Sequence, residues 1–172
     1  PPPELASLSL DAVAQLVAAR RLPPVSAWRP LREADSRMCI AADGRWYHDG
    51  GEITRPAMVR AFASLLWRDE SGQHWLVTPE ERQSVAVEDA ALVAIDVKQE
   101  AGALVFQLNT DDLVIAGPDH PLVARGDPDR PALYLAVRHG VEARLNRSTY
   151  AQVVEIALES GDLSLTSLGA RF

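Results

Sequence analysis

The sequence predicts an α+β fold built from two related subdomains, each made of antiparallel strands and a helix. Helical spacing of apolar residues is confined to three segments, at the start, before the middle and at the end of the chain. Alternation of apolar and polar residues dominates from residue 91 onward. A strand–turn–strand–helix pattern also occurs twice, which indicates an old duplication.

Both copies of the repeated pattern begin with an apolar strand that ends in a glycine turn. The first copy covers residues 39–44 and 53–59, and the second covers 135–140 and 145–151. At an offset of 92 positions the apolar helix positions of the two copies align, Met58, Phe62 and Leu66 with Tyr150, Val154 and Leu158. Chance similarity is the alternative, because such units recur in many folds.

The first helix is expected after the proline-rich start of the chain. Ser9 is a favourable N-cap residue, and the arginines at 20–21 suit the negative end of a helix that the prolines at 23–24 stop. We expect residues 25–37 to form an extended connector anchored by Trp28. The chain begins with prolines and without methionine, so we expect it to be trimmed.

A hairpin and a second helix are expected next. Asp43-Gly44 is the strongest turn signal in the chain and predicts a strand on each side. Apolar spacing then predicts a helix from Arg55 to about Trp67, capped by Thr54. The predicted strands of this region are 38–42, 45–48, 74–77 and 84–87.

The remainder of the chain has mainly the pattern of strands. These are expected over 93–97, 104–108, 113–115, 133–138 and 141–145, with a proline-rich loop over 126–131 and a helix over 148–158. The sequence therefore predicts a tail, helix and connector over residues 1–37, one α+β subdomain over 38–83 and a second over 84–172.

Composition restricts the classes of function. A net charge of −7 argues against binding nucleic-acid polymers or anionic membranes through the whole surface, and no apolar run reaches the roughly 18 residues of a membrane helix. The single cysteine, Cys39, excludes an intramolecular disulfide and favours a cytoplasmic location. His120 lies near Asp112 and Asp119, but no metal-ligand spacing accompanies it, so we expect neither metal nor cofactor.

Each copy of the repeat places an arginine at the start of its helix, Arg55 after Thr54 and Arg147 after Asn146. A cation at this positive end is mildly unfavourable unless an anion lies beside it. The anion could be a bound phosphate or carboxylate held by the guanidinium groups. It could equally be an internal carboxylate, which is the commoner arrangement. The acids available for such a pair are Glu88, Asp89, Asp111 and Asp112.

Other side chains have both a functional and a structural interpretation. Trp46 and His48 alternate onto one face of a predicted strand, where they could receive a base; a core tryptophan with a hydrogen-bonded histidine is the commoner arrangement. Glu88 and Asp89 are adjacent acids at a strand end, so one must point inward. An inward acid can be a general base, but it more often pairs with arginine. No nucleophile elbow accompanies them, so catalysis is not expected.

A series of motifs in order resembles the bacterial domain-of-unknown-function family 1285, from residue 22 to about residue 155. The motifs are Leu22–Val25, Trp28–Pro30, Asp43–His48, Ile53–Ala57, His74–Pro79, Val87–Ala90, Asn109–Asp112, His120–Leu122 and Val137–Leu145. The chain departs from the family pattern at Ala91-Leu92, where proline and an aromatic residue are usual, and at Leu108-Asn109, where Thr-Asn is usual.

The resemblance implies two related α+β units. The second would be a pleckstrin-homology-like, partly open β-barrel capped by the C-terminal helix. It also implies a ligand site at the interface of the two units, suited to a nucleotide-like molecule, and a role in signalling. It implies no enzymatic activity.

We therefore expect a ligand-binding or signalling protein that holds an anionic, nucleotide-like small molecule between its subdomains. The expected contacts are Trp46, His48, Arg55, Glu88, Asp89, Asn109, Asp112, His120, Arg138 and Arg147. The alternative is an adaptor that docks a protein partner without a small ligand. An enzyme is the third and least favoured hypothesis.

Overall fold

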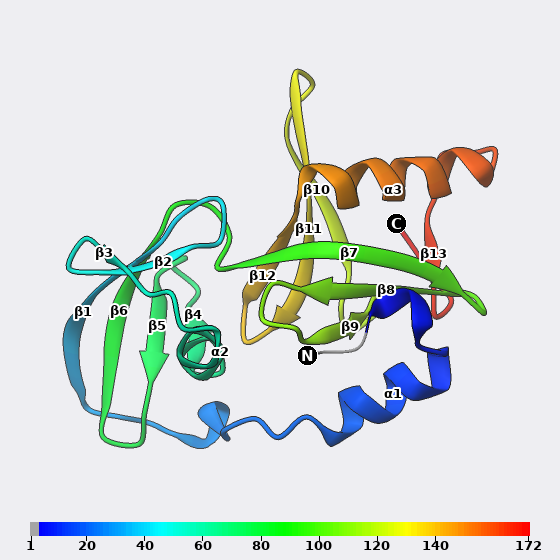
Figure 1. The fold of residues 1–172 in the computed structure, drawn as a ribbon. Coiled ribbons are helices and arrows are strands. Elements are labelled where there is room, and N and C mark those ends of the chain that lie inside the picture. The colour runs from blue at the N-terminus through cyan, green and yellow to red at the C-terminus, as the bar shows by residue number, and fades with distance from the viewer. Residues whose placement is uncertain (1–3) are drawn as a thin grey trace. The chain divides into compact units, whose positions relative to one another are not determined.

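The computed structural model describes residues 4–172 and confirms the α+β class. These residues form two six-stranded sheets, a two-stranded sheet and three α-helices (Figure 1). The chain divides into two compact units. We call residues 21–92 with 137–142 the N-terminal unit, and residues 4–20, 93–136 and 143–172 the C-terminal unit.

The main division of the chain falls at Leu92/Val93, later than the boundary at 83/84 that the sequence predicted. The reason is the strand β6 (Glu81–Val87), which pairs along its length with two other strands of the N-terminal unit. A boundary at 84 would cut this strand in two.

The N-terminal unit is built around a sheet with the strand order β3-β2-β1-β6-β5-β4. The other strands are β1 (Arg32–Ile40), β2 (Trp46–His48), β3 (Gly51–Glu52), β4 (Leu66–Arg68) and β5 (His74–Val77). β1 and β6 pair in parallel, and the other neighbouring strands of this sheet pair antiparallel. The hairpin predicted around Asp43-Gly44 is confirmed as β1–β2.

Two predicted elements of this unit have different bounds. Residues 25–37 are not an extended connector throughout, because a 3-10 helix η2 (Val25–Ala27) is followed by β1 from Arg32, which pairs there with Glu81. The helix α2 (Pro56–Ala63) ends earlier than predicted. Residues 66–68 pair with β5 as the strand β4 and therefore cannot continue the helix.

The start of α2 also corrects a prediction. Its N-cap residue is Arg55 rather than Thr54, and the Arg55 side chain makes no capping hydrogen bond. Pro56 occupies the first helical position, where its fixed φ and missing N–H are tolerated. The helix packs through Phe62 against Trp46, with ring centroids 6.2 Å apart. Trp46 is buried in the core of the unit at 1% exposure.

Residues 138–140 form the turn between β11 (Arg130–Arg138) and β12 (Val141–Leu145), and they contact the edge strand β4. The backbone N–H of Arg68 donates to the carbonyl oxygen of His139 at 2.9 Å, and the Arg68 side chain pairs with Glu142 at 2.9 Å. Gly140 has a φ of +77°, and a Cβ atom there would lie 2.7 Å from the carbonyl oxygen of Arg68. This contact therefore requires glycine.

The C-terminal unit holds a second six-stranded sheet, with the order β10-β11-β12-β7-β8-β9. Its other strands are β7 (Leu92–Glu100), β8 (Ala103–Leu108), β9 (Leu113–Ile115) and β10 (Leu122–Asp127). Residues 126–131, which were predicted to be a loop, instead form the tip of the β10–β11 hairpin, with two pairs of strand residues around a two-residue turn. The sheet is open at β10 and β9, which agrees with a partly open barrel; its likeness to pleckstrin-homology domains stays a prediction.

Helices cover both faces of this second sheet (Figure 1). A 3-10 helix η1 (Leu5–Ser7) and α1 (Leu10–Ala19) pack against Val105 and its neighbours in β9, and the predicted Ser9 cap is confirmed. The helix α3 (Arg147–Glu159) lies across the other side, capped by Asn146 as expected. A small sheet of β13 (Thr166–Ser167) and β14 (Ala170–Arg171), which the sequence analysis missed, closes the chain.

Between residues 4 and 172, none of the helices combines the length and the apolar character that crossing a membrane would need.

Candidate functional site

One face of the N-terminal sheet carries aromatic and charged side chains. Residues that pair directly across neighbouring strands point to the same face. Trp67 of β4 lies opposite Trp75 of β5, and Arg82 of β6 lies opposite both Val77 of β5 and Glu33 of β1. Trp75 and Val77 are two residues apart on one strand. All five side chains therefore share one face of the sheet.

The helix α2 covers the opposite face. Trp75 pairs with Ser84, whereas Ile40 pairs with Val87, three positions further along β6. Ile40 consequently points away from the Trp75 face. Trp46 pairs with Ile40 and stacks on Phe62 of α2. The face that carries Trp67 and Trp75 is therefore not covered by α2. The segment 25–31, which precedes β1, lies against this face.

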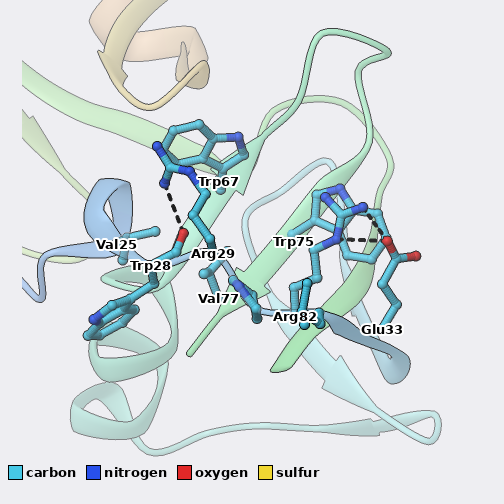
Figure 2. Close-up of a pocket in the computed structure, with 10 residues that line it drawn as sticks. Val25, Trp28, Arg29, Glu33, Trp67, Trp75, Val77 and Arg82 are labelled. Carbon is cyan, nitrogen blue, oxygen red and sulfur yellow. Dashed lines mark hydrogen bonds and ion pairs between the residues drawn. The ribbon is translucent and has the colours of Figure 1, made fainter. Parts of the chain in front are cut away.

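That segment and the sheet enclose a pocket of about 410 Å³ (Figure 2). Its lining residues are Val25, Trp28, Arg29, Pro30, Leu31, Glu33, Trp67, Trp75, Val77 and Arg82. All of them belong to the N-terminal unit. Val25 and Val77 are buried and form apolar parts of the wall, whereas Leu31 at the rim is 97% exposed.

The charges at one end of the pocket are paired with each other. The guanidinium of Arg82 lies 4.0 Å from the ring centroid of Trp75. Arg82 also donates to a carboxylate oxygen of Glu33, through Nε at 3.1 Å and through Nη2 (Figure 2). The indole N–H of Trp75 donates to Asp69 at 3.0 Å. Hydrogen bonds from Ser71 first and then from Trp75 lower the pKa of Asp69 to about 2.

The other end of the pocket contains a cation without an acidic partner. Arg29 donates through Nη1 to the carbonyl oxygens of Ser26 and Trp28, at 2.5 and 2.9 Å. Within residues 4–172 no carboxylate forms an ion pair with Arg29. Figure 2 places Arg29 and Trp67 on one side of Val77, with Trp75, Arg82 and Glu33 on the other. Carbonyl groups thus position Arg29 without neutralising its charge.

The indole ring of Trp67 packs against the imidazole ring of His139. It stacks on His139, with centroids 5.0 Å apart and planes 15° from parallel. Burial, followed by the charge of Arg138, lowers the pKa of His139 below 6.5. The imidazole is therefore mainly neutral at pH 7, and the stack places no further charge beside the pocket.

None of the residues that the sequence analysis proposed for a ligand site lines this pocket. Trp46, His48, Arg55, Glu88, Asp89 and Arg138 belong to the N-terminal unit, and Asn109, Asp112, His120 and Arg147 to the C-terminal unit. Their predicted grouping around one ligand stays a prediction, because the structure determines each unit by itself.

Several of these residues make internal contacts. Asp112 is buried and accepts from Arg20 Nε at 2.7 Å. Asn109 accepts from the N–H of Val93 at 3.1 Å. Other contacts of this kind are those of Glu88 with the Ala42 N–H, of His120 with the Ala136 carbonyl and of Asp112 with Thr110. The Asp112 carboxylate thus has an internal arginine partner, but a different arginine from the predicted one.

The two arginines at the helix starts have no such partner. Arg55 and Arg147 are exposed, and in the described part of the chain neither forms an ion pair. Trp46 is a core residue, as its structural interpretation predicted, although its Nε1 atom lacks a hydrogen-bond partner. His48, on the same face of β2, is half exposed and lies 3.6 Å from Asp49.

Comparisons with known proteins agree with the two-unit division. Residues 23–90 match the model of the N-terminal domain of DUF1285, a domain of unknown function, and residues 91–172 match that of the DUF1285 C-terminal domain. The chain belongs to the DUF1285 family. The junction of the two matched domains lies within two residues of the division at Leu92/Val93.

Two solved structures of DUF1285 proteins are similar to this chain. One, from Silicibacter pomeroyi DSS-3, is 34% identical, with a TM-score of 0.79 over 95% of this chain and 93% of the other. The second, from Shewanella baltica OS155, is 25% identical, with a TM-score of 0.57 over 69% of this chain and 90% of the other. No curated protein matches the chain.

The pocket lies within the DUF1285 N-terminal domain, and sequence reasoning missed its main residues. Trp67 had been assigned to the end of a helix, which hid its relation to Trp75. A signal was nevertheless present. Trp67 and Trp75 lie at equal distances from Ser71, at the centre of the Asp69–Gly72 turn. Read as a hairpin, this spacing places the two indoles on one face.

Proposed function

We propose that this DUF1285 protein is a ligand-binding module with a role in signalling, which holds an anionic, aromatic, nucleotide-like small molecule in the pocket of its N-terminal unit. The observation that carries the proposal is the pair of directly opposed indoles, Trp67 and Trp75, beside the cation Arg29. A flat ring and a negative charge are the complements of these groups.

The size and the chemistry of the pocket support a small ligand. A volume of about 410 Å³ falls in the range of small-molecule sites, roughly 300 to 1,000 Å³. Stacking of a planar ring on a tryptophan is worth about 1 to 3 kcal/mol. The guanidinium of Arg29 can grip a phosphate or a carboxylate through its remaining N–H groups.

The proposal is tested by ligand titration of the whole chain. Quenching of tryptophan fluorescence and isothermal calorimetry would be followed with purine nucleotides and with 2-naphthoate. All four tryptophans of the chain lie in the N-terminal unit, so the fluorescence reports on that unit. We expect saturable binding by wild type and at least a tenfold weaker Kd for Arg29→Ala and Trp67→Leu.

The matched control is Arg55→Ala, which removes an exposed arginine of the same unit that does not line the pocket. It should bind like wild type. If Arg55→Ala abolished binding and Arg29→Ala had no effect, the helix-start site would replace the pocket. If no member of the panel bound wild type, the proposal of a small aromatic anion would be wrong.

A protein-interaction adaptor is the second candidate, and the exposure of Leu31 favours it. Leu31 is 97% exposed and lies among the residues that line the pocket, so its apolar side chain is accessible to a partner. The test is Leu31→Asp, which should abolish recovery of a stoichiometric protein partner that Arg55→Ala, outside the pocket lining, still recovers. For either candidate we propose a cytoplasmic location, supported by the single cysteine.

A further inference from the structure

We infer that the pocket selects ligands with one negative charge over ligands with two, and that Glu33 sets this selectivity. The inference rests on the proposed function, because it specifies the ligand class of the same site. It follows from how the charges that line the pocket are distributed between paired and unpaired groups.

Three of the lining residues are charged: Arg29, Glu33 and Arg82. Arg82 and Glu33 form an ion pair and so cancel most of each other's field at the pocket. The charge of Arg29 is left without an acidic partner, because its contacts are with carbonyl oxygens. The pocket therefore presents one uncompensated cation to a ligand.

Arg82 is poorly placed to take a second anionic group. Its guanidinium is held on one side by the ring of Trp75 and on another by the Glu33 carboxylate. A second anion that approached Arg82 would have to displace this carboxylate or lie beside it. Like charges at such separation repel, and the repulsion opposes dianion binding.

Removing the charge of Glu33 should make Arg82 available to a second anionic group of the ligand. In Glu33→Gln the amide can still accept a hydrogen bond from Arg82, but it no longer neutralises it. The pocket then presents two cations, and a dianion gains more than a monoanion. Because Glu33 is about half exposed, we expect a moderate shift of the dianion-to-monoanion affinity ratio, of about fivefold.

The experiment compares ligands that share a ring but differ in charge. The first pair is adenosine 3′,5′-cyclic monophosphate, with one negative charge, and adenosine 5′-monophosphate, with about two at pH 8. The second pair is 2-naphthoate and 2,6-naphthalenedicarboxylate. Kd values are measured by calorimetry at low salt for wild type, Glu33→Gln and Glu70→Gln. Glu70 is exposed and outside the pocket lining, so its variant changes the net charge equally.

We expect wild type and Glu70→Gln to prefer the monoanion of each pair, and Glu33→Gln to shift the ratio about fivefold toward the dianion. An unchanged ratio in Glu33→Gln, an equal shift in Glu70→Gln, or a wild-type preference for dianions would overturn the inference and leave the proposed function standing. Failure of wild type to bind any of the four compounds would overturn both.

Discussion

The two six-stranded sheets of this protein differ in how their faces are covered. In the C-terminal unit helices lie on both faces, and Val105 and Phe106, successive residues of β8, are both 0% exposed. In the N-terminal unit α2 covers one face, whereas the segment 25–31, which includes Trp28, crosses the other face beside Trp67 and Trp75. A sheet that is packed on both faces supports the fold. A sheet with an α-helix on only one face has room for a pocket on the other.

This difference also separates the tryptophans of the N-terminal unit by role. Trp46 lies on the helix-covered face and is 1% exposed. Trp67 and Trp75 lie on the other face and stay partly exposed. The same residue type is therefore a core residue on one face of the sheet and a candidate ligand platform on the other.

The largest expected effect comes from removing Phe106, which should break the doubly covered sheet. Phe106→Ala should lower the free energy of unfolding by about 3 to 5 kcal/mol, because a fully buried ring leaves a cavity. Trp67→Ala should cost less, about 1 to 2 kcal/mol, because the indole is only partly buried. Urea unfolding followed by circular dichroism measures both. Equal losses would contradict the contrast between the two sheets.

A smaller effect is expected at the β11–β12 turn, which contacts β4 near Trp67. Gly140→Ala should destabilise the N-terminal unit by about 2 to 4 kcal/mol, since a Cβ atom there meets a backbone carbonyl at positive φ. Gly72→Ala is the control, because Gly72 also has positive φ but no atom within 4 Å, and should cost about 1 kcal/mol. Thermal unfolding by tryptophan fluorescence compares them. Similar losses would show that the close approach is not tight in solution.

The smallest expected effect is a pH dependence confined to the N-terminal unit. His74 is 6% exposed, and burial followed by the charge of Arg68 lowers its pKa below 6.5. The unfolded chain therefore binds more protons than the folded chain as the pH falls below about 6.5. The contribution of neutral, buried His74 to the free energy of unfolding is therefore complete above this pH and is lost progressively as the pH falls below it. The shift of the His139 pKa acts in the same direction.

Tryptophan fluorescence should accordingly show a lower urea midpoint at pH 5.5 than at pH 7.5. His74→Gln should reduce this difference, because the amide does not titrate. The control is His48→Gln, which removes an exposed histidine of the same unit. An undiminished pH difference in His74→Gln would assign the effect to other groups.

Much of the fold could be predicted from local signals. The Asp43-Gly44 turn, the Ser9 and Asn146 caps and the strand over residues 104–108 each depend on neighbouring residues alone, and each was confirmed. The errors fell where pairing with a distant segment decides the structure. Residues 66–68 continue the apolar pattern of α2 but pair with β5, and residues 32–37 are a strand because β6 lies beside them.

The candidate site was less predictable for the same reason. Arg55 and Arg147 attracted attention because a cation at a helix start is locally unusual, and helix electrostatics can be read from neighbouring residues. Arg29, Glu33 and Arg82 are unremarkable in their local sequence. They become a site only because strand register brings Glu33 opposite Arg82 and because residues 25–31 cross the same face.

The sequence by itself determined the α+β class, the family and most turns and caps, because these depend on periodicity and on residues close together in the chain. The tertiary structure alone decided which face of the N-terminal sheet remains without a helix, and which arginine keeps an unpaired charge there. Side-chain neighbours across strands are set by register, and register joins segments that are far apart in the sequence.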